Sequence, residues 1–415
     1  MENDKKWDLI SIASIPLIMT LGNSMLIPVL PAIRSKLGVS SLQVSLLITV
    51  YSAVAIVLIP LAGYLSDRWS RKTVIIPSLL ITGIGGLISG LAAWKMTDSY
   101  TVILLGRALQ GIGAAGAFPI VLPLVGDLFK QESDVSSGLG VVETANTFGK
   151  VLSPILGSAL AFIVWYLPFL AIPVFCAVSM LLVLFLVKTP PKEGDAPPAS
   201  FSSFLAGVRS IFKQKGRWLY AIFAVGGLCM LVIFGTLFYL SDALEEQFHI
   251  DGILKGCVLA IPLAVLCVSS FATGKAIGKN KKRMKWITFA GITLLASSIL
   301  LCGMVHSLYL VIALMAFAGM GIGAALPCLD AMITEGIEKQ QRGTITSIYS
   351  SMRFIGVAAG PPLASVLMKM SVSVMFYVIS ALCMAAAIAA LFAIRPKNAE
   401  AAGLTGLRGN MEPRT

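Results

Sequence analysis

The sequence predicts an all-α membrane protein whose twelve transmembrane helices form two pseudo-symmetric six-helix bundles. Its 415 residues are 57% hydrophobic and only 13% charged, and the mean hydropathy is +0.88. A soluble protein of this length needs more polar surface to cover its core. Apolar runs instead recur at the length of about 20 residues that crosses roughly 30 Å of hydrocarbon, and the second half of the chain repeats motifs of the first.

Twelve apolar runs follow one another along the chain. The first, at residues 9–30, is expected to remain as a span, because it is too long for a signal peptide and no small-residue cleavage site follows it. The other spans of the first bundle are expected at 42–64, 74–93, 101–123, 137–162 and 164–187. Those of the second bundle are expected at 218–240, 253–273, 286–304, 308–333, 344–367 and 372–394.

Residues 1–187 therefore form the predicted N-terminal bundle, residues 218–394 the C-terminal bundle, and residues 395–415 a cytoplasmic tail. The linker at 188–217 begins with a Pro-rich stretch. Within it, residues 201–212 have the pattern of a short amphipathic helix that lies on the membrane surface.

An internal repeat relates the two bundles. The sequence GIGAA occurs at Gly111 and again at Gly321, an offset of 210, and GKVLSP from Gly149 aligns with GVAAGP from Gly356, an offset of 207. Two matches in order, at nearly the same offset, indicate a duplicated six-span unit. Two such bundles joined by a cytoplasmic linker are typical of transporters whose substrate site lies between the halves near the midplane.

The basic residues indicate how the chain is oriented. Of 32 Lys and Arg, 24 fall in the termini and in the loops on the same side, and 5 fall in the opposite loops. By the positive-inside rule, both termini are cytoplasmic. The net charge of +12 is explained by this topology and by contact with anionic lipid, so no nucleic-acid partner is expected. The remaining 3, Arg107, Lys150 and Arg353, lie within spans.

The sequence gives no signal for a catalytic or metal centre. Its 7 cysteines form no C-x-x-C pair and have no histidine nearby, so they are interpreted as small buried apolar residues. No Walker motif is present, and no nucleophile stands beside a base. We therefore expect no enzyme activity, no metal and no cofactor.

The loop GYLSDRWSRK, from Gly63 to Lys72, places four charges directly after an apolar span. It resembles the signature loop of the major facilitator superfamily, with Ser70 where the family usually has Gly. The resemblance implies a conformational latch, in which Asp67 approaches a helix N-terminus of the other half and Arg71 reaches a second carboxylate. The alternative is a basic cytoplasmic loop with no further role. The latch set is Gly63, Asp67, Arg68, Arg71, Lys72 and Asp127.

A second motif, GRALQGIGAAG, begins at Gly106. It is similar to the span-4 motif of proton-coupled members of the superfamily, with Arg107 and Gln110 at the matching positions. An arginine inside a span is costly without a partner, and the resemblance implies a role for Arg107 in proton transfer. The alternative is an arginine that extends to the outer headgroups.

A third motif, GKVLSPILGSA, lies in the fifth span. It resembles the antiporter signature of the superfamily: Gly149, Pro154 and Gly157 match, while Ser153 and Ser158 replace glycines. The spacing of Gly149, Ser153 and Gly157 gives a stripe of small residues for a close helix crossing, and Pro154 bends the helix. In the family this motif marks exporters that exchange substrate for protons.

Charged and polar side chains inside the spans are the remaining candidates. Glu143 and Asp330, together with Arg107, are the predicted proton-coupling residues, although each carboxylate could instead neutralise a basic neighbour. Lys150 and Arg353 favour an anionic or phenolate-bearing cargo if both face the cavity, and are structural contacts if the two carboxylates pair with them. The predicted substrate cavity comprises Asn23, Tyr51, Asn146, Lys150, Phe234 and Arg353.

The resemblance implies a proton-coupled exporter of small amphiphilic compounds or drugs of the drug–proton antiporter kind, which works by alternating access and is driven by the proton gradient. The alternative is a dedicated exporter of an endogenous anionic metabolite such as a siderophore or glycolipid. An importer is disfavoured by the third motif, and a transporter-like receptor would lack proton coupling. The expected partners are a small-molecule substrate, protons and the lipid bilayer. The chain is expected as a monomer in the cell (inner) membrane.

Overall fold

The computed structural model describes residues 3–129, 132–187, 201–278, 280–337 and 339–394, and every regular element in these ranges is a helix. Twelve stretches are long and apolar enough to cross a membrane, which confirms the predicted number of spans. The first half contains α1 (Asn3–Ser24), the 3₁₀ turn η1 (Ile27–Val29), α2 (Leu30–Leu37), α3 (Ser41–Arg68), α4 (Arg71–Lys95), α5 (Tyr100–Ala117), α6 (Val121–Leu128), α7 (Glu132–Ile163) and α8 (Leu167–Leu186). The second half contains α9 (Phe201–Glu246), α10 (Gly252–Ile277), α11 (Lys281–Cys302), α12 (Leu308–Gly336), α13 (Lys339–Met370) and α14 (Val372–Ala393).

The first span is longer than hydropathy predicts, because its prolines begin new helical segments. Pro28 and Pro31 stand at the first turns of η1 and α2, where a residue without an amide hydrogen is tolerated. The span therefore continues past residue 30 to Leu37 and ends at Gly38, whose φ of 62° closes the helix. This extension places Arg34 on a rigid turn at the end of the bundle.

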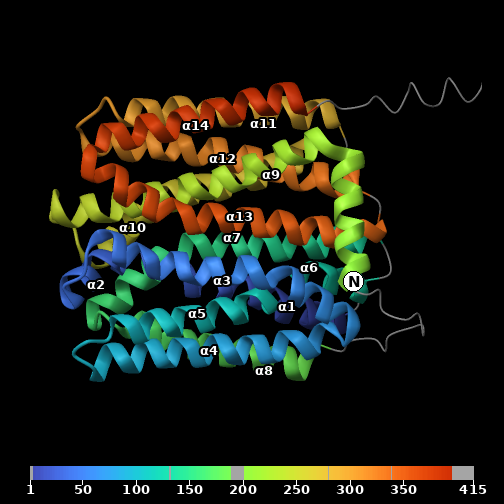
Figure 1. Ribbon diagram of the computed structural model, residues 1–415, viewed down its shortest axis with the longest axis horizontal. Helices are drawn as coiled ribbons and strands as arrows, with labels where there is room; N and C mark the ends of the chain where they lie inside the picture. Colours follow the sequence, from blue (N-terminus) through green and yellow to red (C-terminus); the bar gives the residue numbers. More distant parts are fainter. Residues whose placement is uncertain (1–2, 130–131, 188–200, 279, 338, 395–415) are drawn as a thin grey trace, which may run out of the picture.

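The helices run side by side along the long axis of the molecule (Figure 1). The blue to green helices of the first half lie below the yellow to red helices of the second half. The chain begins at the right-hand end, and α2 lies at the left-hand end. Following the orientation expected from the basic residues, we call these the expected cytoplasmic end and the expected outer end.

The segment between the halves is described only in part. Residues 188–200 and the tail at 395–415 lie outside the described residues. The first part of α9, which includes residues 201–212, crosses the expected cytoplasmic end of the bundle (Figure 1). Non-helical backbone at Gly216, with φ 12° and ψ −97°, separates it from the part of α9 that runs through the bundle.

The aligned glycines of the repeat have the same packing role in both halves. A Cβ on Gly149 of α7 would lie 3.1 Å from the carbonyl oxygen of Leu17 on α1. A Cβ on Gly356 of α13 would overlap the carbonyl of Gly227 on α9. In each half the glycine thus lets the fifth span press against the first span, as expected for a duplicated unit.

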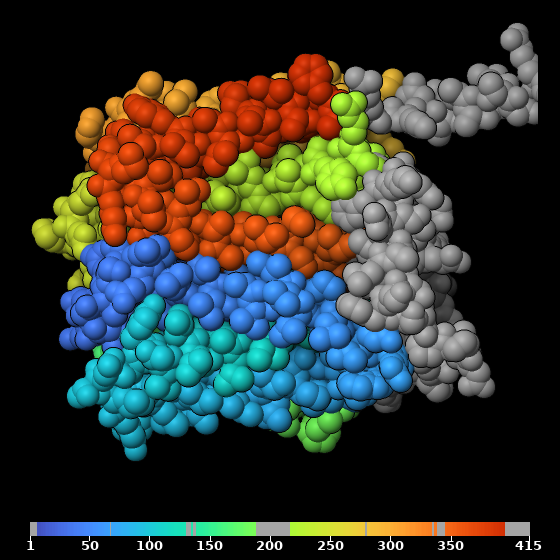
Figure 2. Space-filling view, viewed as in Figure 1, coloured from blue at the N-terminus to red at the C-terminus, as the bar shows by residue number. Residues whose placement is uncertain are grey.

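The two halves meet along two pairs of helices. One pair is α3 and α13, which form the seam between blue and orange segments in Figure 2, and there Thr49 Oγ1 donates a 2.7 Å hydrogen bond to the carbonyl of Ala358. The other pair is α7 and α10, where a Cβ on Gly256 would overlap the carbonyl of Pro154. The site lies between these two contacts.

Candidate functional site

A cavity of about 80 Å³ lies between the halves. Its walls come from α1, α3 and α7 of the first half and from α9 and α13 of the second half, with Phe118 from the turn between α5 and α6. The structure brings to this cavity all six residues that the sequence assigned to it: Asn23, Tyr51, Asn146, Lys150, Phe234 and Arg353.

Lys150 lines the cavity from α7 and is buried, with 8% of its surface exposed. Within the described residues, its ammonium forms no hydrogen bond or ion pair. Removing an ammonium from water without such compensation costs several kcal/mol. A cation held in this way is poised to bind an anionic group that enters the cavity.

Arg353 reaches the cavity from α13, on the other half. Its Nη1 lies 4.0 Å from Asp330 Oδ1 on α12, at the limit of an ion pair, and its guanidinium lies 5.8 Å from the centre of the Tyr349 ring. Arg353 thus has a carboxylate neighbour, whereas Lys150 has none at that range among the described side chains. The two cations are not equivalent.

Glu143 is held by its own helix. Asn146, one turn further along α7, donates from Nδ2 to both carboxylate oxygens of Glu143, at 3.2 and 3.3 Å, while Thr20 on α1 donates to Asn146 Oδ1 at 2.6 Å. The structure therefore places one candidate proton carrier in each half, Glu143 beside Asn146 and Asp330 beside Arg353.

Arg107 lies on α5 and is fully buried, so it does not extend to the outer headgroups. Its guanidinium bonds only to neutral acceptors among the described residues: the carbonyls of Leu47 and Gly22 and the side chains of Asn23 and Gln110. No carboxylate is among these acceptors, and the role of Arg107 in proton transfer stays a prediction.

Aromatic rings close one side of the cavity. Phe354 on α13 lies 6.4 Å, between ring centroids, from both Tyr51 on α3 and Phe118. The contact with Phe118 is edge-to-face at 75°, a favourable geometry for two rings. A flat apolar or aromatic group of a cargo could stack against this wall.

Arg71 and Lys72 of the signature loop bond to residues of the first half. Arg71 Nε lies 3.0 Å from Asp127 Oδ2 on α6, and Lys72 Nζ donates to the carbonyls of Leu184 and Val187 at the end of α8, at 2.8 and 2.9 Å. Arg68 is exposed, and the side chain of Asp67 lies outside what the structure describes. The approach to the other half comes at Gly63, where a Cβ would lie 3.7 Å from Ser347 Oγ.

The antiporter-like motif packs α7 between α1 and α10. A Cβ on Gly157 would overlap the carbonyl of Met25, so this glycine, like Gly149, faces the first span. Pro154 faces the second half through Gly256, and Ser153 donates to the carbonyl of Lys150 at 2.9 Å. The small residues thus hold the helix that carries Lys150 close to both neighbours.

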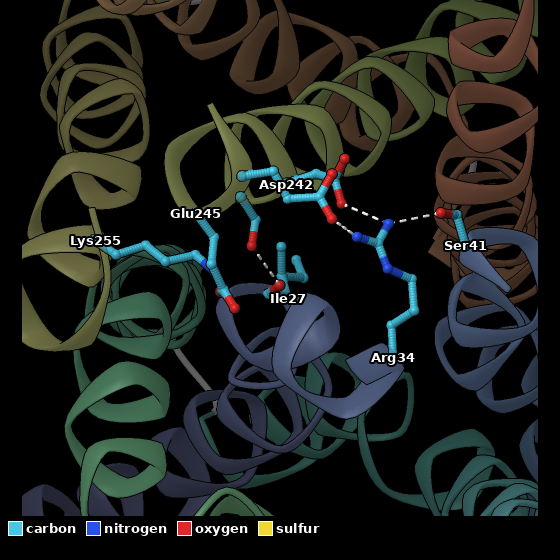
Figure 3. A network of polar contacts seen from close by, with 8 residues as sticks. Ile27, Arg34, Ser41, Asp242, Glu245 and Lys255 are labelled. Carbon is cyan, nitrogen blue, oxygen red and sulfur yellow. Dashed lines mark hydrogen bonds and ion pairs between the residues drawn. The ribbon is translucent and has the colours of Figure 1, made fainter. Parts of the chain in front are cut away.

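A network of charges at the expected outer end joins the two halves and was not predicted from the sequence (Figure 3). Arg34 on α2 donates to Asp242 on α9 at 2.9 Å, forms an ion pair with Glu246, and donates to Ser41 at 2.7 Å. Beside it, the buried Lys255 of α10 lies 2.6 Å from Glu245. We call the contacts of Arg34 with Asp242 and Glu246 the Arg34 clamp.

The comparisons with known proteins agree with this architecture. The chain matches the family model of the Major Facilitator Superfamily over residues 12–300 and 246–413. It is similar to the bacillibactin exporter of Bacillus subtilis (strain 168), with 54% identity over 377 residues that cover 91% of this chain and 93% of that protein. It is also similar to the class D tetracycline resistance protein of Salmonella ordonez, with 26% identity over 84% of this chain and 86% of that protein.

Two solved structures share the fold. The human organic anion transporter MFSD10 superimposes with a TM-score of 0.74 at 19% identity, over 94% of this chain and 100% of that chain. A bacterial homologue of the human lysosomal transporter Spinster, in an inward-facing and unoccupied conformation, gives 0.76 at 16% identity over 100% of both chains. The bacillibactin exporter and the two solved structures are described as transport proteins or as a homologue of one.

Proposed function

Because this chain belongs to the major facilitator superfamily, we propose that it exports a siderophore of the bacillibactin kind across a bacterial cell membrane by alternating access. The 54% identity to the bacillibactin exporter supports the dedicated exporter of an endogenous metabolite, which the sequence offered as the alternative to drug export. The relatives named for drug resistance share 22–26% identity with this chain and support only the transporter class.

The proposal rests mainly on the position of Lys150, which lines the cavity without an ion-pair partner among the described residues. A siderophore binds ferric iron through oxygen donors, because hard cations prefer oxygen ligands, and these groups are anionic when deprotonated. A buried ammonium that has no carboxylate partner among the described residues, with Arg353 across the same cavity, suits such a cargo. The rings of Tyr51, Phe118 and Phe354 offer an apolar wall to the rest of it.

Transport by purified protein tests the assignment. Reconstituted vesicles with an imposed pH gradient, acidic inside, should accumulate bacillibactin against its concentration gradient, and an excess of tetracycline should not compete with it. Empty vesicles control for leakage. Accumulation of tetracycline without any movement of bacillibactin would overturn the siderophore assignment and restore drug export as the function.

We propose that transport is coupled to protons and that Asp330 is the main carrier, since it lies 4.0 Å from the cation Arg353 of the cavity wall, whereas Glu143 is bonded to the neutral amide of Asn146. Asp330→Asn should abolish the proton movement that accompanies bacillibactin transport. Glu143→Gln should reduce it less, because Asn146 can bond the amide as well. The measurement is the change of a pH-sensitive dye inside the vesicles. Proton movement that persists in Asp330→Asn would reject this carrier.

Alternating access requires one end of the bundle to close while the other opens. The Arg34 clamp and the packing of Gly256 against Pro154 both join the halves at the expected outer end. These contacts support a cycle in which the cargo enters from the expected cytoplasmic end in the conformation seen here. The expected outer end then opens by separation of α7 from α10.

A further inference from the structure

We propose that Arg107 is a positioning residue that turns the amide of Asn23 so that its hydrogen-bond donors face the cargo. The proposal rests on the proposed function in one respect, that the cargo presents oxygen acceptors. It differs from the role in proton transfer that the motif around Arg107 implies.

Arg107 ties three helices together beneath the cavity wall. From α5, its Nε donates to the carbonyl of Leu47 on α3 at 2.9 Å, and Nη1 donates to the carbonyl of Gly22 on α1 at 3.3 Å. Nη2 donates to Asn23 Oδ1 at 2.5 Å. The guanidinium also lies 4.6 Å from the centre of the Tyr51 ring, a cation–π contact.

The orientation of Asn23 follows from the chemistry of its partner. A guanidinium has only donors, so the amide of Asn23 must present its oxygen to Arg107. Its Nδ2, with two donor hydrogens, is then directed away from Arg107, and Nδ2 donates no hydrogen bond to any of the described residues. Because Asn23 lines the cavity, those donors are available to the cargo.

Arg107 also contacts two further residues, Tyr51 and Gln110. Tyr51, held by the cation–π contact, also lines the cavity and lies against Phe354 of the other half. Gln110 accepts from Arg107 through Oε1 and has an unpartnered, buried Nε2. The amides of Asn23 and Gln110 thus present their acceptor oxygens to Arg107 and direct their donor nitrogens away from it. The cavity gains the donors of Asn23 in addition to the cations Lys150 and Arg353.

A double-mutant cycle tests the inference. Arg107→Met, which keeps much of the side-chain length but has no donor, should raise the KM for bacillibactin about tenfold, the loss expected for one hydrogen bond of about 1.4 kcal/mol, with little change in maximal rate. Asn23→Leu should raise KM by a similar factor. In the Asn23→Leu background, Arg107→Met should add less than about twofold, because the donor it positions is already gone. Arg107→Lys, which keeps a donor for Asn23, should restore most of the wild-type KM.

Each outcome that contradicts the inference leads to a different conclusion. If the two KM effects multiply, Arg107 does not act through Asn23. If Arg107→Met leaves KM unchanged but abolishes the response of internal pH, Arg107 serves proton transfer instead. Melting temperatures of the wild type, the two single variants and the double variant give a readout that needs no cargo. If the effects of the two substitutions on melting temperature are non-additive while the wild type does not transport bacillibactin, the Arg107–Asn23 contact stands and the proposed function is rejected.

Discussion

Lys150→Gln is expected to lower bacillibactin export by about tenfold to a hundredfold without loss of folded protein. A hydrogen bond to a charged group contributes roughly 1.5–3 kcal/mol, and each 1.4 kcal/mol is about a factor of ten in affinity. The Lys150 side chain is largely buried, and its ammonium forms no bond with the described side chains, so its replacement removes part of a desolvation penalty without breaking a contact. Export should fall while the melting temperature stays level or rises.

A fall in export together with a level or higher melting temperature identifies Lys150 as a residue that binds the cargo. Initial rates of bacillibactin uptake into inverted vesicles and melting in detergent are the two measurements. Lys150→Arg should retain much of the export, because it keeps the positive charge. Lys275→Gln, a change of the same chemistry on an exposed lysine of α10 that lies over the Phe271 ring, should alter neither. A destabilised Lys150→Gln with normal export per folded molecule would contradict the assignment.

The twelve spans could be predicted from hydropathy because the bilayer fixes the length of each apolar run. The ends of the spans could not, because local backbone geometry and polar contacts decide them. The first span continues to Leu37 through helical turns that begin at prolines. The seventh continues past residue 240 to Glu246, since Arg34 and Lys255 bind the carboxylates of its last turn.

The cavity residues could be chosen from the sequence because polar side chains are rare inside apolar spans. The Arg34 clamp lies at the ends of spans, where charges are common, so no single residue of it is conspicuous. One signal does exist. Arg34 and Asp242 are 208 residues apart, between the two repeat offsets of 207 and 210. Equivalent positions of two repeats meet near the axis that relates them, and opposite charges at such positions predict a contact.

Gly256→Val is expected to abolish most export by preventing the expected outer end from closing. A Cβ on Gly256 would overlap the carbonyl of Pro154 and lie 2.9 Å from Ser158 Cβ on α7. Overpacking of this kind costs about 1–3 kcal/mol, and it acts only while α7 and α10 are in contact. The equilibrium between closed and open states should shift by roughly 5- to 150-fold toward the open state.

Ser158 reports the shift because it is 5% exposed in the closed arrangement. In a Cys257→Ser background, Ser158→Cys should react with a membrane-impermeant maleimide at least about fivefold faster once Gly256→Val is added. Gly274→Val is the matched control: it places the same side chain on the same helix, where no atom lies within 4 Å. If Gly256→Val exports normally and leaves the labelling rate unchanged, this end does not open during transport.

The Arg34 clamp should matter less than this packing contact. Partly exposed ion pairs contribute about 0.2–1 kcal/mol each, and the side chains of Arg34 and Glu246 are 20% and 50% exposed. Arg34→Gln should therefore accelerate labelling of Ser158→Cys only severalfold, and high salt should reproduce part of its effect on the wild type. A larger effect of Arg34→Gln than of Gly256→Val would mean that charge, rather than helix packing, holds the expected outer end closed.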